Sequence, residues 1–236
     1  MLFLTLDKQG LALALLMGAA FLLLGLQFGI FFVFTMLLFL VLSAVVTYIG
    51  QNYKKRLFGI ESERRGVKNV LANGLAPLLA VIAFFGFAFS GLGKPEALCV
   101  IGFVASVAAI AADKFESEIG VFDGMPRAIF TMKKVKKGTS GAVTWLGLAS
   151  GILASLLIAL MLILVVHPLQ TLYATNAPLA ASTVVSVIIG GFAGSVVDSM
   201  LGYYEERGVG NKYTSNLVCG ICGGIVGALL FLLIAS

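Results

Sequence analysis

Long apolar runs constrain this chain more than any other feature. Residues 10–50 are almost entirely apolar, and a helix that spans a bilayer needs only about 20 residues. This run therefore suits two spans, broken near residues 26–29. Only 11% of the residues are charged, against about 25% in soluble domains. We expect an all-α, polytopic membrane helix bundle forming one domain, residues 1–236. Its predicted spans are roughly 10–27, 29–50, 69–91, 97–117, 142–166, 179–203 and 213–235.

Basic residues gather on one side of these seven spans. Lys8 and the loops 51–68, 120–141 and 204–213 fall on that side, whereas Lys94 is alone on the other. The positive-inside rule then predicts a cytoplasmic N-terminus. Merging or re-entry near either end of the chain leaves the number of spans open. The net charge of +5 belongs to these loops, so we expect membrane lipids as partners and no nucleic acid.

Acidic residues lie inside or at the end of two predicted spans, and Asp113, Glu118 and Asp198 are the candidates for catalysis among them. A charged group at a helix centre costs about 2.5–3.5 kcal/mol on insertion scales, which indicates a function. On an ideal helix Asp113 and Glu116 share one face, whereas Lys114 and Glu118 form an i,i+4 pair about 100–140° away. Either the helix breaks near Glu118 or only one acid reaches the site. The structural alternative is a solvated helix end with a surface ion pair.

A glycine- and lysine-rich loop, residues 136–141, precedes the predicted span 142–166. Gly138 and Gly141 let the backbone approach an anion, and Lys137 adds positive charge. Thr139 or Ser140 can cap the next helix, whose first amide groups favour a phosphate. The order of residues is not that of a Walker A loop. The structural alternative is a basic loop that ends in an ordinary helix cap.

Further polar residues lie near these two places. An arginine beside the third span suits bidentate phosphate contacts, and two asparagines follow it one helical turn apart. Other polar residues interrupt stripes of small residues on the last two spans, where close packing of helix backbones is the structural explanation. The additional candidates for substrate or phosphate binding are Arg65, Asn69, Asn73, Ser195, Ser199 and Asn216.

Four segments together resemble domain-of-unknown-function family 92, which includes transmembrane protein 19 and the plant phytyl-phosphate kinase. The family usually has threonine where Lys114 stands and a small residue where Glu116 stands, which makes both poor candidates for a shared site. Tyr203 to Glu206 also depart from the family pattern. The four segments are residues 65–74 (RGVKNVLANG), 112–120 (ADKFESEIG), 138–147 (GTSGAVTWLG) and 191–202 (GFAGSVVDSMLG).

This resemblance implies an isoprenoid-phosphate kinase that converts a prenyl monophosphate, of the phytyl or geranylgeranyl type, to the diphosphate. The expected co-substrate is a nucleoside triphosphate, with CTP preferred. The expected cofactor is Mg²⁺, held by Asp113, Glu118 and Asp198. The short chain without a plant-type targeting sequence suggests the cell membrane of an archaeon or bacterium, with the active site facing the cytoplasm. Association into a homo-oligomer stays open.

Two other functions remain open at this point. A nucleotidyltransferase that forms a CDP-lipid would use the same acids and Mg²⁺. An ion-coupled transporter or flippase would use Asp113 and Asp198 as ion sites. Such carriers often contain paired repeats and broken helices near the bilayer midplane. The polar clusters of this chain lie toward one membrane face and no repeat is visible, which favours an enzyme.

Overall fold

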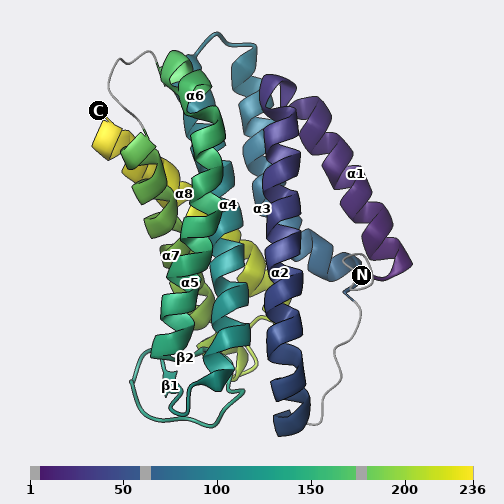
Figure 1. The fold of residues 1–236 in the computed structure, drawn as a ribbon, viewed down its shortest axis with the longest axis vertical. Coiled ribbons are helices and arrows are strands. Elements are labelled where there is room, and N and C mark those ends of the chain that lie inside the picture. The colour runs from purple at the N-terminus through teal and green to yellow at the C-terminus, as the bar shows by residue number, and fades with distance from the viewer. Residues whose placement is uncertain (1–5, 59–64, 174–179, 236) are drawn as a thin grey trace.

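The computed structural model describes residues 6–58, 65–173 and 180–235. It is a bundle of helices, which confirms the predicted polytopic all-α class (Figure 1). Within the described residues six helical segments are long and apolar enough to cross a membrane, and the 17-residue α1 is shorter. The elements are α1 (Lys8–Leu24), η2 (Leu26–Phe28), α2 (Gly29–Phe58), α3 (Val67–Ala88), α4 (Gly93–Ile119), η3 (Gly120–Phe122), β1 (Arg127–Ala128), β2 (Ala142–Val143), α5 (Trp145–Ala159), η4 (Leu160–Val165), α6 (Val166–Tyr173), α7 (Ala180–Glu205) and α8 (Lys212–Ala235).

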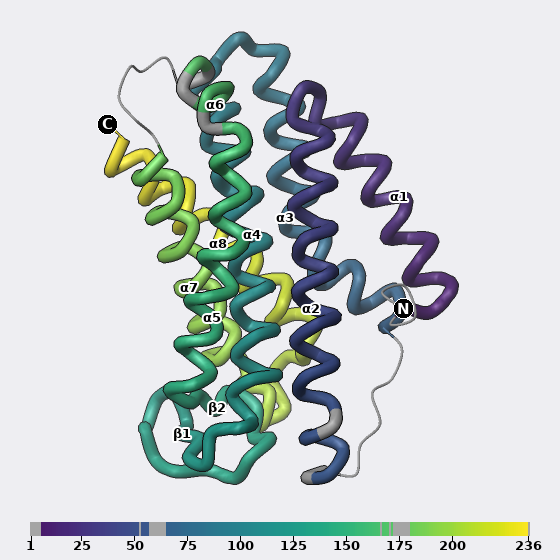
Figure 2. The backbone as a smooth tube through the Cα atoms, in the orientation of Figure 1, coloured from purple at the N-terminus to yellow at the C-terminus, as the bar shows by residue number. Residues whose placement is uncertain are grey.

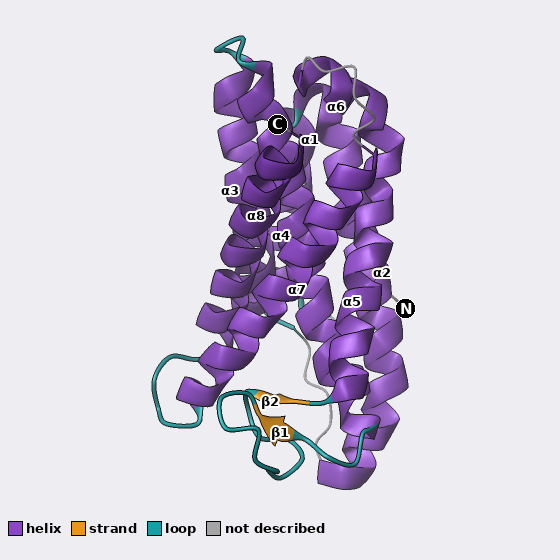
Figure 3. Cartoon of the chain, turned by 90° about the vertical axis from the view of Figure 1, so that its left-hand side faces the viewer, coloured by secondary structure: helices purple, strands orange, loops and turns teal. Residues whose placement is uncertain are grey.

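The chain runs back and forth along the long axis (Figure 2). Helices α2, α4 and α7 end at the lower end of the view, and α5 and α8 begin there. The short antiparallel pair β1–β2 lies at the same end, where Arg127 pairs with Val143 (Figure 3). We call this end the loop end, defined by residues 54–58, 120–144 and 205–212. Most of the described lysines and arginines belong to it.

Helix α4 forms the centre of the bundle. Its most apolar 18-residue window is 83% buried, against 33–39% for the other five candidate spans. Apolar and small residues such as Ala105, Ala108 and Ala112 cover all its faces, and a helix that is apolar all round is typically buried. Helices α2, α3, α5, α7 and α8 pack around it. An acid carried by α4 is therefore held inside the bundle.

Small residues bring α7 close to its neighbours, as the sequence predicted. A Cβ atom added to Gly190 would lie 2.7 Å from the carbonyl oxygen of Gly223 on α8. One added to Gly194 would lie 2.5 Å from the Cβ of Ala109 on α4. In lipid, water supplies no hydrophobic driving force between helices, so the dispersion contacts made by such close backbone approach stabilise their packing. It also fixes how far Asp198, one turn after Gly194, stands from α4.

Several helix boundaries differ from the prediction, and α2 continues to Phe58, beyond its predicted end at residue 50. The predicted span 97–117 begins earlier, at Gly93, and continues without a break to Ile119. The predicted span 142–166 begins later, because residues 142–143 form β2. Thr144 is the N-cap of α5, and its Oγ1 accepts a hydrogen bond from Gly147 N at 3.0 Å. The predicted cap by Thr139 or Ser140 is therefore wrong, and these residues belong to a loop ahead of β2.

The region after α5 also differs. The helix tightens into the 3₁₀ turn η4 and continues as α6 to Tyr173. The polar loop predicted to start at His167 is thus helical for one or two turns, and its remainder, 174–178, lies outside the described residues. The side chains of Leu162 and Leu169 in this region are both buried. Burial by neighbouring helices explains why the helical form persists past the predicted end.

Candidate functional site

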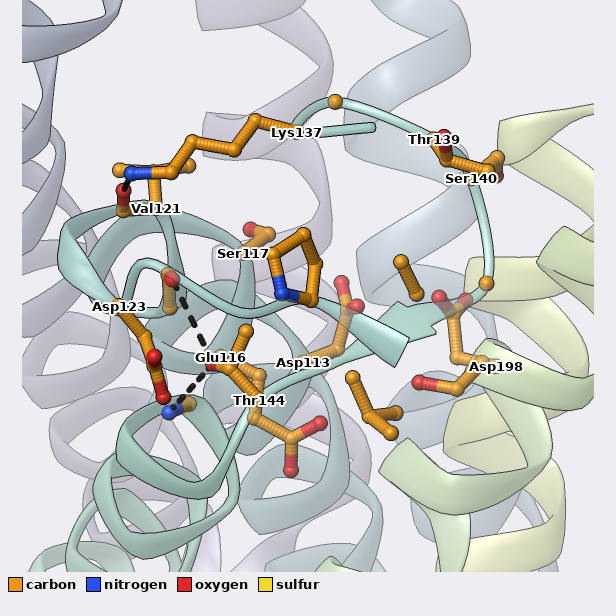
Figure 4. A pocket seen from close by; sticks show the side chains of 18 of the residues that line it. Asp113, Glu116, Ser117, Val121, Asp123, Lys137, Thr139, Ser140, Thr144 and Asp198 are labelled. Carbon is orange, nitrogen blue, oxygen red and sulfur yellow. Dashed lines mark hydrogen bonds between the residues drawn. The ribbon is translucent and has the colours of Figure 1, made fainter. Parts of the chain in front are cut away.

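A cavity of about 430 Å³ opens at the loop end of the bundle. It lies between α4, α5 and α7, under the loop that leads to β2 (Figure 4). Acidic, basic and hydroxyl side chains from distant parts of the sequence meet there. Those with polar side chains are Lys54, Asp113, Glu116, Ser117, Asp123, Lys137, Thr139, Ser140, Thr144, Asp198, Ser199 and Lys212.

The central pair of the cavity is Asp113 of α4 and Asp198 of α7. Their carboxyl groups point into the same space and are close enough to interact (Figure 4). Asp198 Oδ1 is buried and has no hydrogen-bond partner within the described protein. A buried carboxylate oxygen without a partner is costly, and a second carboxylate beside it raises that cost. The pair is therefore built to receive a cation or a donor from a ligand.

The donor set of this pair fits Mg²⁺. Magnesium is typically bound by one or two protein carboxylates, with waters and substrate phosphates as the other ligands. Among the residues that the structure describes, no three His, Cys, Asp or Glu side chains form a metal-binding group. Two carboxylates would leave the other coordination positions of Mg²⁺ to water and substrate phosphates.

Glu116 is a third acid of the cavity, and it lies one turn after Asp113 on α4. The hydroxyl of Ser195 on α7 donates to Glu116 Oε1 at 2.7 Å. Gly151 of α5 leaves room for this carboxyl group, because a Cβ atom there would overlap it. Sequence reasoning set Glu116 aside on its departure from the family pattern. The sequence feature that would have assigned Glu116 to the cavity is its position on the same helical face as Asp113.

Glu118 lies elsewhere. Its carboxylate contacts Lys54 of α2 at 2.8 Å and forms the predicted i,i+4 pair with Lys114. The side chain is 6% exposed. Because α4 stays helical through Ile119, it turns Glu118 away from Asp113, so the structure does not bring these two acids together. Lys54 does line the cavity, and Glu118 therefore positions a basic group of the site.

The predicted phosphate loop, residues 137–141, does line the cavity. Lys137 Nζ donates to the Val121 carbonyl at 2.9 Å (Figure 4). It also donates to the Tyr53 hydroxyl at 3.1 Å. These contacts hold the loop against α2 and η3. The positive φ angles of Gly138 and Gly141, 88° and 71°, shape its turn, since other L-residues rarely adopt them.

The same loop is fastened to the end of α7. Gly141 packs directly on the backbone of Gly202. Ser140 N donates to Glu206 Oε1 at 2.7 Å, and Ser140 Oγ donates to Glu205 Oε2 at 3.1 Å. The amide of Ser140 is thus occupied by a carboxylate, and the backbone anion site predicted at a helix start is not formed here. The loop still lines the cavity with its glycines and with Lys137, Thr139 and Ser140.

Lys212 and Thr144 are cavity residues that sequence reasoning did not select. Lys212 begins α8 and faces the two aspartates across the cavity. Its spacing of four residues from Asn216 was a usable signal, because such residues share a helix face. Ser199, which was predicted, lines the cavity next to Asp198. Three lysines and four acids therefore surround one space.

Residues 2–222 match the family described as "Integral membrane protein DUF92". The chain belongs to this family. It is 34% identical over 229 residues to the "Uncharacterized membrane protein MJ0933" of Methanocaldococcus jannaschii, covering 96% of this chain and 86% of that protein. It is 33% identical over 179 residues to "Protein PGR" of Arabidopsis thaliana, covering 71% of this chain and 62% of the plant protein. No solved structure matches this DUF92 chain.

The remaining predicted residues of the DUF92 chain lie outside this cavity. Arg65, Asn69 and Asn73 line a second, mostly apolar cavity of about 120 Å³ between α1, α2 and α3. Asn216 of α8 donates to Asn73 Oδ1 at 3.2 Å, and its own Oδ1 is buried without a hydrogen-bond partner among the described residues. The sequence therefore predicted polar residues that the structure divides between two neighbouring cavities.

Proposed function

We propose that this DUF92 protein is a membrane-embedded phosphotransferase that converts an isoprenoid monophosphate to the diphosphate with a nucleoside triphosphate and Mg²⁺. The observation that carries the proposal is the facing pair Asp113–Asp198, with a partnerless buried oxygen, in a cavity that lysines also line. Phosphoryl transfer needs positioned phosphates and neutralised charge more than covalent chemistry from the protein. The cavity has the groups for both tasks.

Each group of the cavity has a role in this proposal. Asp113 and Asp198 would hold Mg²⁺, which when bound would neutralise charge on the phosphate oxygens. Lys137 and Lys212 both line the cavity and would bind phosphate groups of the donor. The acceptor is itself an anionic phosphate, so no strong general base is required. No histidine is among the described residues that line the cavity, and transfer of a phosphoryl group to an anionic acceptor does not require one.

The position of the cavity supports a lipid substrate. It lies at the end of a bundle of apolar helices, where a lipid headgroup meets water. We propose that the loop end faces the cytoplasm of an archaeal or bacterial cell, because it carries most of the basic residues. CTP is the preferred donor on the family resemblance. An acceptor with an apolar chain and a phosphate head would keep its chain among the helices.

A product assay tests the proposal. Purified protein in mild detergent receives geranylgeranyl phosphate, Mg²⁺, and CTP, ATP or GTP in turn, and mass spectrometry identifies the lipid product. We expect geranylgeranyl diphosphate as the product when one of the three nucleotides is supplied as donor. We expect no product when a chelator removes the metal. Asp198→Asn serves as the inactive control. A nucleotide-linked lipid with released pyrophosphate would instead establish a nucleotidyltransferase. A folded sample that turns over no prenyl phosphate would favour a transporter.

A further inference from the structure

The second cavity is a groove between α1, α2 and α3. Helices α1 and α2 join at the top of Figure 1 and diverge toward the loop end, and α3 lies beside them. Apolar side chains line most of it, including Met17, Val33, Met36 and Phe39. Gly18 also lines it, and a Cβ atom built there would have no neighbour within 4 Å. The groove therefore has free space beside α1, at a place where the helix has no side chain.

One end of the groove is polar and positively charged. Arg65 lines it and donates from its two terminal nitrogens to the hydroxyls of Ser43 and Thr47 on α2, each at 2.9 Å. Burial lowers the pKa of Arg65, and the negative charge of Glu118 opposes this shift. An arginine stays protonated in proteins, so the end of the groove holds a partly buried positive charge.

The described charges near Arg65 form a small cluster with Glu118, Lys54 and Lys114. Glu118 interacts with Arg65 at a distance, but it directly contacts both Lys54 and Lys114. These four groups therefore contain three cations and one anion. A positive cluster at the end of an apolar groove is complementary to a molecule with one hydrocarbon chain and an anionic head.

Two contacts link the groove to the Asp113–Asp198 cavity. Asn73 of the groove accepts a hydrogen bond from Asn216, which lies one turn after Lys212 of the cavity. Lys54 lines the cavity and contacts Glu118 of the charged cluster. The polar end of the groove is thus the end that adjoins the proposed site of phosphoryl transfer.

We propose that this groove binds the hydrocarbon chain of the lipid acceptor, an isoprenoid monophosphate, with its phosphate directed toward Arg65. The assignment rests on the proposed function and names the place of its substrate. The chain lies between α1 and α2, and the phosphate lies at the edge of the cavity where the nucleotide binds. Arg65 then acts on the acceptor, whereas Lys137 and Lys212 act on the donor.

Photolabelling tests this assignment without relying on turnover. The probe is geranylgeranyl phosphate with a diazirine at the end of its chain, added without nucleotide, and mass spectrometry locates the labelled peptides. We expect labels in residues 14–21 and 33–40. Gly18→Leu fills the groove and should reduce this labelling about tenfold. Gly86→Leu is the matched control, because Gly86 also has open space but lies outside the groove.

A second variant tests whether the phosphate group of the lipid points toward Arg65. Arg65→Gln should reduce labelling by the phosphate probe and leave labelling by the same chain ending in a hydroxyl unchanged. Equal labelling of wild type and Gly18→Leu, or labels confined to the other apolar cavity between α3, α4 and α8, would overturn the assignment. So would labelling by a phosphatidylglycerol probe that geranylgeranyl phosphate fails to displace, since that result marks a bilayer-lipid site. Labelling in the groove without diphosphate formation would instead refute only the kinase proposal.

Discussion

Replacing Glu118 tests whether this residue belongs to a structural ion pair or is a ligand of the metal. The Lys54–Glu118 contact of 2.8 Å corresponds to a Coulomb attraction of about 6 kcal/mol at an effective dielectric constant of about 20. Desolvation offsets part of it, and removing one partner of a buried pair costs about 3–5 kcal/mol. Lys54 and Lys114 are 30% and 22% exposed and can regain water, so we expect about 3 kcal/mol for Glu118→Gln.

The assay is thermal unfolding in detergent. For a chain of this size, 1 kcal/mol corresponds to about 2–4 °C, so Glu118→Gln should lower Tm by about 6–12 °C. Asp113→Asn is the matched control on the same helix and should leave Tm nearly unchanged. In a double-mutant cycle with Lys114→Gln, the two losses should be strongly non-additive. A Glu118→Gln protein that keeps its Tm but loses all turnover would refute this reasoning and place Glu118 in the metal site.

Three further predictions test the site and its supports. Asp198→Asn should reduce turnover by at least about 10²-fold, the usual scale for losing a group that stabilises transition-state charge, with Tm retained; near-normal turnover would remove Asp198 from the mechanism. Thr144→Ala removes the N-cap of α5 and should cost about 1 kcal/mol, seen as a lower Tm that Thr144→Ser largely restores. Gly194→Ala inserts a methyl group against Ala109 and should cost about 1–3 kcal/mol, whereas Gly86→Ala, with open space around it, should keep the wild-type Tm.

The fold class followed from the sequence because long apolar runs allow few alternatives. Hydrophobicity located the spans, and the spacing of small residues predicted the close approach of α7 that Gly191 and Gly194 confirm. Boundaries were less predictable. Residues 142–143 pair with β1, and a pairing with a distant strand cannot be inferred from the local pattern that suggested a helix.

The candidate site was predictable where residues share a helix and less so where helices meet. Helical periodicity placed Asp113 and Glu116 on one face and paired Lys114 with Glu118. It carried no information about which helix each face would meet. Lys54 approaches α4 because α2 is long enough to carry it there: α2 has 30 residues, or a length of about 45 Å. A helix of that length continues beyond the bilayer core, so its last turn reaches the loop end.

The separation of Arg65 from the Asp113–Asp198 cavity also follows from helical periodicity. Neighbouring residues on a helix point about 100° apart, so Asp113 and Lys114 of α4 face different parts of the bundle. Asp113 meets Asp198 of α7, and Lys114 meets Glu118 beside α2. The central helix thereby presents Asp113 and Glu116 to the first cavity, and Lys114 and Glu118 to the charged cluster that interacts with Arg65. Lys114 interacts electrostatically with both Glu118 and Arg65, so it adds positive charge beside the proposed acceptor phosphate. Lys114 is therefore the residue whose replacement should affect acceptor use more than nucleotide binding.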